Sequence, residues 1–206
     1  MAKRRTPSPA DFVARVAKDC KARGVTLRLE AVHRVQIYRG TYCSGYFDSG
    51  SKELVVAVAR PDWLSILAHE YAHMQQWVEG EFVEDDDSFH KFDQWVAGKM
   101  ELEDDELTRC VRLIQRCELD AEKRAVEYLR RYRLRKDLAD YRRRANAYVL
   151  FYEVARRHRR WSDKESPYTV PTVYRQMSTR FVSSLSHITK KFEAAVLKEC
   201  MGRRKG

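Results

Sequence analysis

Two histidines separated by three residues, His69 and His73, are the feature that most constrains how this chain of 206 residues folds. The surrounding pattern predicts a helix from about residue 63 to residue 77. On a helix the two imidazoles are one turn apart and project from the same face. Glu70 lies between them, and three such polar groups among apolar neighbours are costly unless something satisfies them. The segment therefore predicts a helix that carries a polar site.

These residue types at this spacing are typical of a zinc site. Two imidazole nitrogens one turn apart can bind one tetrahedral ion, and a glutamate beside them can act on a water molecule bound to that ion. We expect one zinc ion per chain, bound by His69 and His73, with Glu70 as the general base for hydrolysis of a peptide bond. Because the motif has only three fixed positions, a structural histidine pair is the alternative.

A third zinc ligand is expected in a long helix that the apolar pattern predicts from about Asp105. Glu118 falls on the apolar stripe of this helix, where a carboxylate needs a partner such as a metal ion. Glu122, one turn later, is placed to accept a hydrogen bond from the far nitrogen of a ligand histidine. The alternative for Glu118 is an ion pair with a neighbouring arginine on a solvated face.

Three stretches of the sequence resemble a known family: HEYAHMQQW at 69–77, ELDAEKRAVEYL at 118–129 and ANAYVLFY at 145–152. The first two are similar to the glutamate-type zincins (gluzincins), and all three are similar to small zinc metallopeptidases encoded by tailed bacteriophages. In gluzincins the later glutamate, here Glu118, is the third ligand, and the acidic residue four positions on, here Glu122, orients a histidine. The resemblance implies zinc, a minimal zincin core and a site of action in the cytoplasm of an infected cell.

His90 is an alternative third ligand. It follows His73 by 17 positions and loosely resembles the third histidine of the Spartan-like proteases, which act on DNA-bound proteins. Those proteases usually have a glycine after this histidine, where the present chain has Lys91. We rank His90 behind Glu118 and keep a role for it in assisting the transition state.

The charges are unevenly distributed along the chain. Net charge is +7 over residues 1–60, −12 over 61–122 and +15 over 123–206, for a total of +10. The basic last third favours a nucleic acid or an acidic protein as partner, and a nucleic-acid- or protein-binding module is the alternative to a peptidase. Solvated helix faces that pair with the acidic segment explain the same pattern equally well.

The order of the elements predicts an α+β protein, mostly helical, with a small antiparallel sheet near the N-terminus packed on the motif helix. The apolar run at 54–59 is the expected strand along which a peptide substrate aligns. We expect a last helix from Phe181 to Cys200. Between these elements no internal repeat is found.

A single domain is expected over residues 10–200, with a catalytic core at about 30–130 and a helical extension at about 138–200. Residues 1–9 and 201–206 are expected to be basic ends, the first of them flexible. No apolar run is long enough to span a bilayer and no secretory signal follows the start, so we expect a cytoplasmic protein without a membrane partner. Five cysteines without a CxxC pair argue against a disulfide framework.

Overall fold

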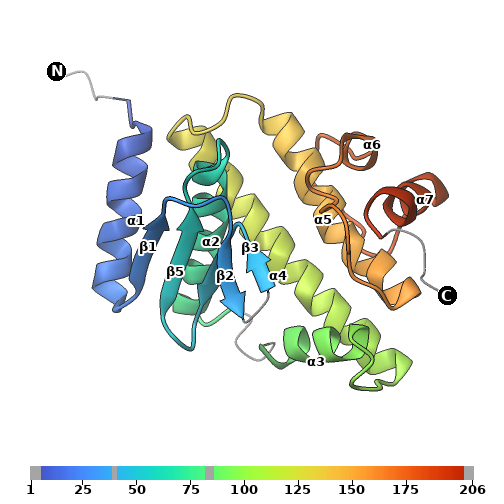
Figure 1. Cartoon of the computed structure of the whole chain (residues 1–206). Coiled ribbons are helices and arrows are strands. Elements are labelled where there is room, and N and C mark those ends of the chain that lie inside the picture. The colour runs from blue at the N-terminus through green and yellow to red at the C-terminus, as the bar shows by residue number, and fades with distance from the viewer. Residues whose placement is uncertain (1–5, 39–40, 82–85, 202–206) are drawn as a thin grey trace. The chain divides into compact units, whose positions relative to one another are not determined.

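The structure, a computed structural model, describes most of the chain, namely residues 6–38, 41–81 and 86–201. Its contacts divide the chain into two compact units, one of residues 1–81 and 121–138 and the other of residues 82–120 and 139–206 (Figure 1). The single domain expected from the sequence stays a prediction. The expected basic ends lie largely outside the described residues.

The described residues form an α+β protein that is mostly helical, as the sequence predicted. The helices are α1 (Pro9–Arg23), α2 (Trp63–Val78), α3 (Asp86–Val96), α4 (Asp104–Arg131), α5 (Leu138–His158), α6 (Pro171–Tyr174) and α7 (Lys190–Glu199). The strands are β1 (Thr26–Glu30), β2 (Val35–Tyr38), β3 (Thr41–Cys43), β4 (Gly45–Asp48) and β5 (Glu53–Ala57). Within the described ranges, no helix combines the length and the apolar character that crossing a membrane requires.

The strands of the first unit form two small sheets. In the three-stranded sheet the order is β1-β5-β4, with β1 parallel and β4 antiparallel to β5, whereas β2 and β3 form a separate antiparallel pair. The sequence pattern missed β1, so the expected sheet lacked its one parallel pairing. The strand β5 is central, and its continuous apolar run is buried.

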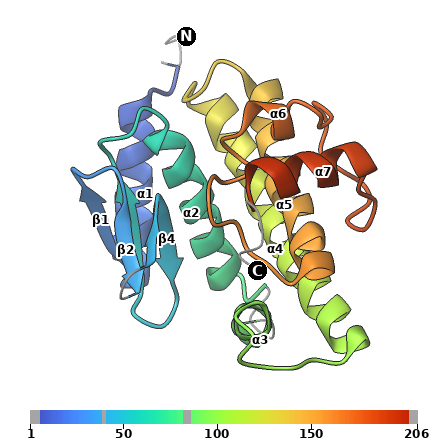
Figure 2. The same cartoon turned by 45° about the vertical axis from the view of Figure 1, so that its right-hand side comes forward.

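The central position of β5 corrects one prediction. A peptide substrate was expected to align along the apolar run at 54–59, but β5 already pairs with β1 on one side and β4 on the other. Its backbone groups are used within the sheet, so that prediction is wrong. Among the described strands, β4 is the edge strand next to β5 and lies near α2 (Figure 2).

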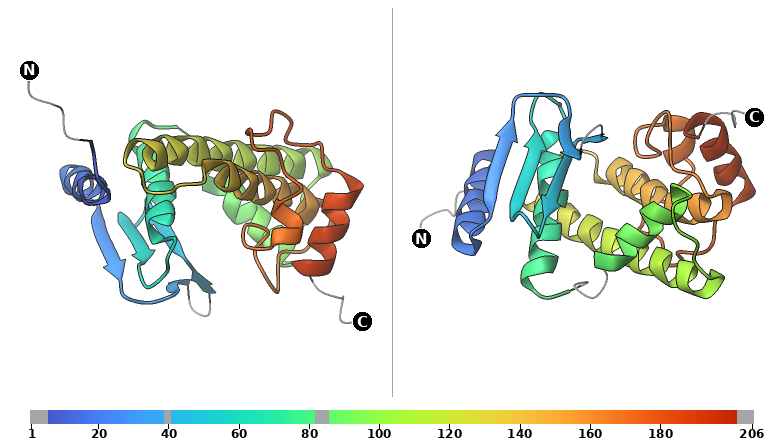
Figure 3. Two further views of the ribbon diagram at one scale, coloured as in Figure 1. Left: turned by 90° about the horizontal axis from the view of Figure 1, so that it is seen from above. Right: turned by 60° about the horizontal axis from the view of Figure 1, so that its bottom comes forward.

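Helices α1 and α2 cover the same face of the three-stranded sheet (Figure 3). Ser8 caps α1 in a capping box with Asp11, and Gly24 ends it in the left-handed conformation with φ of 68°. Phe12 of α1 packs edge-on against Tyr71 of α2 with ring centroids 6.1 Å apart. This ring contact packs α2 against α1 on that face.

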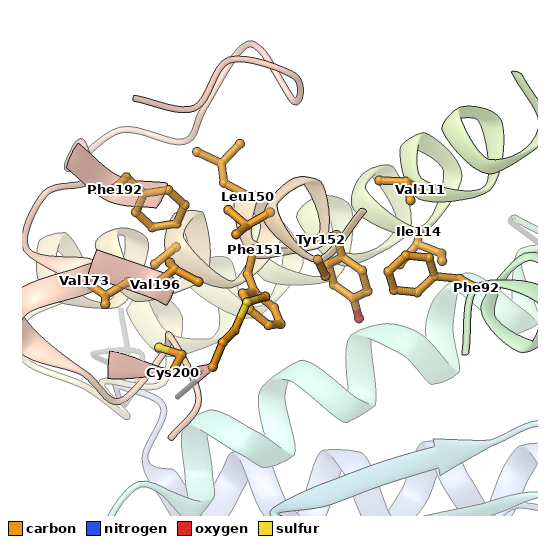
Figure 4. Close-up of a cluster of buried hydrophobic side chains, with 14 of the residues drawn as sticks. Phe92, Val111, Ile114, Leu150, Phe151, Tyr152, Val173, Phe192, Val196 and Cys200 are labelled. Carbon is orange, nitrogen blue, oxygen red and sulfur yellow. The ribbon is translucent and has the colours of Figure 1, made fainter. Parts of the chain in front are cut away.

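The second unit has a core of aromatic and aliphatic side chains from its helices (Figure 4). Phe92 of α3, Ile114 of α4, Phe151 and Tyr152 of α5 and Phe192 of α7 contribute to it. All five are at most 5 % exposed. This packing holds the first half of α4 against α5.

The last helix is shorter than expected, since α7 begins at Lys190 rather than at Phe181. Side chains from other helices bind the preceding segment through its backbone. Asn146 donates to the carbonyls of Ser178 and Arg180, just before the expected start, and accepts from the amide of Val182, while Arg112 donates to the carbonyl of Leu185 at 2.9 Å. Because these backbone groups are bound to side chains, they do not form helical hydrogen bonds.

Candidate metal centre

The two histidines of α2 face each other across one helical turn. Nε2 of His69 lies 3.1 Å from Nε2 of His73, and the two rings are nearly perpendicular. A tetrahedral zinc ion with Zn–N bonds of about 2.0–2.1 Å separates its ligand nitrogens by about 3.3 Å. The observed separation therefore fits two imidazoles that share one ion.

The other ring nitrogens face oxygen atoms. Nδ1 of His73 lies 2.9 Å from Oε1 of Gln76, and Nδ1 of His69 lies 3.5 Å from Oε1 of Glu122. An oxygen acceptor beside Nδ1 favours the tautomer with the proton there, which leaves the Nε2 lone pair for a metal. Glu122 thus lies near His69, and its predicted role in orienting that histidine stays a prediction.

Gln76 was not found from the sequence. It is 2 % exposed and lies three positions after His73, so that both side chains share one helix face. Its spacing from His73 was the available signal. The adjacent Gln75, two positions after His73, lies on a different face, where its Oε1 accepts a hydrogen bond from the Tyr128 hydroxyl at 2.6 Å.

Glu118 completes a group of three side chains that could hold a metal ion. One ligand atom each from His69, His73 and Glu118 lies within 4.8 Å of the others. The boundary between the two units falls inside α4, after Asp120, and Glu118 lies one helical turn before Glu122. The donor set of two imidazoles and one carboxylate fits zinc, because three protein ligands leave a fourth position for water or substrate.

The Glu118 carboxylate has a tyrosine partner on α5. The hydroxyl of Tyr152 donates to Oε1 of Glu118 at 3.4 Å, and the hydroxyl of Tyr148 lies 3.2 Å from that of Tyr152. Burial raises the pKa of Tyr152 well above its usual value, and the nearby Tyr148 and Glu118 act in the same direction. The Tyr152 phenol is therefore a neutral hydrogen-bond donor.

Glu70 is buried against the sheet, with 9 % of its surface exposed. A Cβ atom at Gly45 of β4 would lie 3.3 Å from Cγ of Glu70 and 2.8 Å from Cγ2 of Ile66, so the close approach of α2 and β4 requires glycine. Burial, and then the Glu70 charge, raise the pKa of Cys43 to about 11. The contact with Gly45 thus places Glu70 beside the first residue of β4.

His90, the alternative third ligand, lies on α3. It is exposed on α3 and is not a member of the group formed by His69, His73 and Glu118 among the described residues. The ranking of Glu118 ahead of His90 as the third ligand stays a prediction. A role for His90 in the transition state stays a prediction.

Many arginines of the basic last third have partners within the second unit. Arg144 donates to Asp140 at 2.7 Å and to the hydroxyl of Tyr174 at 2.7 Å. Arg156 and Arg157 both bind the buried carboxylate of Glu153. These guanidinium groups bind side chains of the same third of the chain, not of the acidic segment, and a nucleic acid or an acidic protein as partner stays a prediction.

Comparison with known protein families, curated proteins and solved structures found no match for this chain. The resemblance to bacteriophage metallopeptidases stays a prediction.

Proposed function

We propose that this protein is a zinc-dependent metallopeptidase in which His69, His73 and Glu118 bind zinc and Glu70 is the general base. The observation that carries the proposal is the 3.1 Å approach of the two Nε2 atoms. Both Nδ1 atoms lie near oxygen atoms, which favours the tautomers that leave the Nε2 lone pairs for a metal, and the 3.1 Å separation fits one ion shared by the two atoms. A site of action in the cytoplasm belongs to the same proposal.

The roles of the side chains follow from their chemistry. Zinc, when bound, supplies a Lewis acid that polarises the scissile carbonyl and lowers the pKa of the attacking water. Glu70 accepts the proton of that water and delivers it to the leaving amine. Glu122 and Gln76 orient the ligand histidines through the Nδ1 atoms.

The edge strand β4 supports a peptide as the substrate. Among the described strands it pairs with β5 alone, so its other edge can offer backbone donors and acceptors to an extended chain. Gly45, the first residue of β4, lies directly against Glu70. A peptide added to this edge would therefore run past the general base.

The test is the substitution Glu70→Gln, which preserves the shape of the side chain and removes its basicity. We expect hydrolysis of an unstructured protein substrate to fall by about 10²–10⁴-fold, because that is the usual contribution of a general base. Zinc content, measured by inductively coupled plasma mass spectrometry, should remain at one ion per chain. Glu79→Gln, at the end of the same helix, is the matched control and should keep full activity.

Two results would contradict the proposal. One is a Glu70→Gln variant that cleaves as fast as the wild type. The other is a zinc-loaded wild type that cleaves no member of a broad peptide library.

A further inference from the structure

The pair of tyrosines on α5, Tyr148 and Tyr152, lies beside the proposed third ligand and has no role in the mechanism above. Tyr152 is 5 % exposed and packs against Phe92 and Trp161 with ring centroids 5.8 and 5.1 Å apart. Its ring is thus fixed by the core of the second unit (Figure 4). Its hydroxyl, in contrast, is directed to the carboxylate of Glu118.

The direction of the hydrogen bonds follows from the number of protons. Each hydroxyl has one hydrogen to donate, and an ionised carboxylate can only accept. Since Tyr152 gives its hydrogen to Oε1 of Glu118, the 3.2 Å contact between the hydroxyls requires Tyr148 to be the donor to Tyr152. The result is a chain of donors from Tyr148 through Tyr152 to the metal-binding carboxylate.

We propose that Tyr152 is a positioning residue for the metal site: its hydroxyl holds Oε1 of Glu118 and so presents Oε2 to the ion, and Tyr148 fixes that hydroxyl. This inference rests on the proposed zinc site. Groups that hydrogen-bond to metal ligands lower the cost of binding because they orient the ligand before the ion arrives. The packing of the Tyr152 ring against Phe92 and Trp161 limits the positions that its hydroxyl can take.

The test is the zinc affinity of Tyr152→Phe, measured by competition with a chromophoric chelator on the full chain. Loss of such a partner typically weakens metal binding about 10–100-fold, and we expect a weakening in that range. Tyr174→Phe is the matched control, because its hydroxyl is also buried and also binds a charged side chain, Arg144, at 2.7 Å. It should bind zinc within about twofold of the wild type, the scatter expected for a distant site.

A double-mutant cycle with Glu118→Ala shows whether Tyr152 acts through that residue. Tyr152→Phe should lose its effect on zinc affinity in the Glu118→Ala background. An equal effect in both backgrounds would overturn the inference, as would wild-type affinity in Tyr152→Phe. If Tyr152→Phe does not fold, Tyr148→Phe replaces it, with an expected weakening of about threefold from one lost neutral hydrogen bond. Unchanged affinity in Tyr148→Phe would then overturn it.

The inference and the proposed function can fail separately. Zinc affinity is measured without substrate, so an inactive protein still reports on Tyr152. Conversely, loss of hydrolysis in Glu70→Gln supports the peptidase whatever Tyr152→Phe does to zinc.

Discussion

The histidine motif of α2 and the arginine cluster around Glu153 on α5 both place polar groups in a helical setting, yet they differ in how those groups are matched. Around Glu153, three guanidinium groups surround one carboxylate, so opposite charges meet. On α2, two imidazole Nε2 atoms face each other at 3.1 Å. A cluster of opposite charges stabilises the fold, whereas two imidazole Nε2 atoms at this separation are placed to share a metal ion, as we propose for α2.

The largest change in zinc affinity is expected from removing one of the two imidazoles of α2. His73→Ala should weaken zinc binding on the order of a thousandfold, because roughly 10–16 kcal/mol of binding is shared among three or four ligands. The unfolding free energy of the metal-free protein should change little. His158→Ala, which removes a histidine bound to Glu193 at 2.9 Å, is the control and should leave zinc affinity unchanged. Equal zinc affinity in both variants would show that His73 does not bind the metal.

Glu153→Gln tests the matched cluster. The side chain is 2 % exposed and binds Arg112, Arg156 and Arg157. Removing its charge leaves three cations without their common partner, so the unfolding free energy from urea titration should fall by about 3 kcal/mol. Zinc affinity should not change. A stable variant that has lost zinc would show that this cluster, too, belongs to the metal site.

The stability that Glu153 contributes should depend on pH. Burial alone would raise the pKa of Glu153, but Arg156, Arg112 and Arg157 hold it below 4.5, the usual value. A carboxyl with a lowered pKa in the folded state contributes stability above its unfolded pKa and loses it as pH falls. The difference in unfolding free energy between wild type and Glu153→Gln should therefore be full near pH 7 and shrink below pH 4.5. A difference that grows on acidification would contradict the matched-charge interpretation.

Glu122→Gln tests whether the carboxylate beside His69 contributes to zinc binding. It preserves size but weakens the acceptor that lies 3.5 Å from Nδ1 of His69, so zinc affinity should fall about 10–100-fold. Chelator competition measures this change. Glu127→Gln, five positions further along α4 and exposed, should bind zinc like the wild type. If both variants bind zinc normally, Glu122 does not orient His69.

The smallest effect is expected for exposed matched charges. Arg130→Ala removes an ion pair with Glu127 whose side chains are 66 % and 62 % exposed. Solvent screens such pairs, so the unfolding free energy should change by less than about 0.5 kcal/mol. A loss as large as that of Glu153→Gln would show that exposure does not separate the two kinds of pair.

Local patterns in the sequence predicted the elements that carry the site. The apolar spacing predicted α2 almost to its observed bounds, and helical phase placed Glu118 and Glu122 one turn apart on α4. These features depend on neighbours in the chain, so a sequence can show them.

The features that were missed depend on contacts between distant segments. The edge position of β4 follows from the pairing of β1 with β5, which lie more than twenty residues apart. The role of Tyr152 depends on its contact with Glu118, 34 positions earlier. A tyrosine on an apolar helix face is usually a core residue, and only the partner of its hydroxyl distinguishes it.

X-ray absorption spectroscopy of the zinc-loaded wild type identifies the atoms bound to the metal, and so tests whether His69, His73 and Glu118 are the ligands. We predict one zinc ion per chain with nitrogen and oxygen ligands at about 2.0–2.2 Å, including scattering from two imidazole rings. The chain has five free cysteines that could bind zinc instead. A shell of sulfur at about 2.3 Å, or fewer than two imidazoles, would contradict the account.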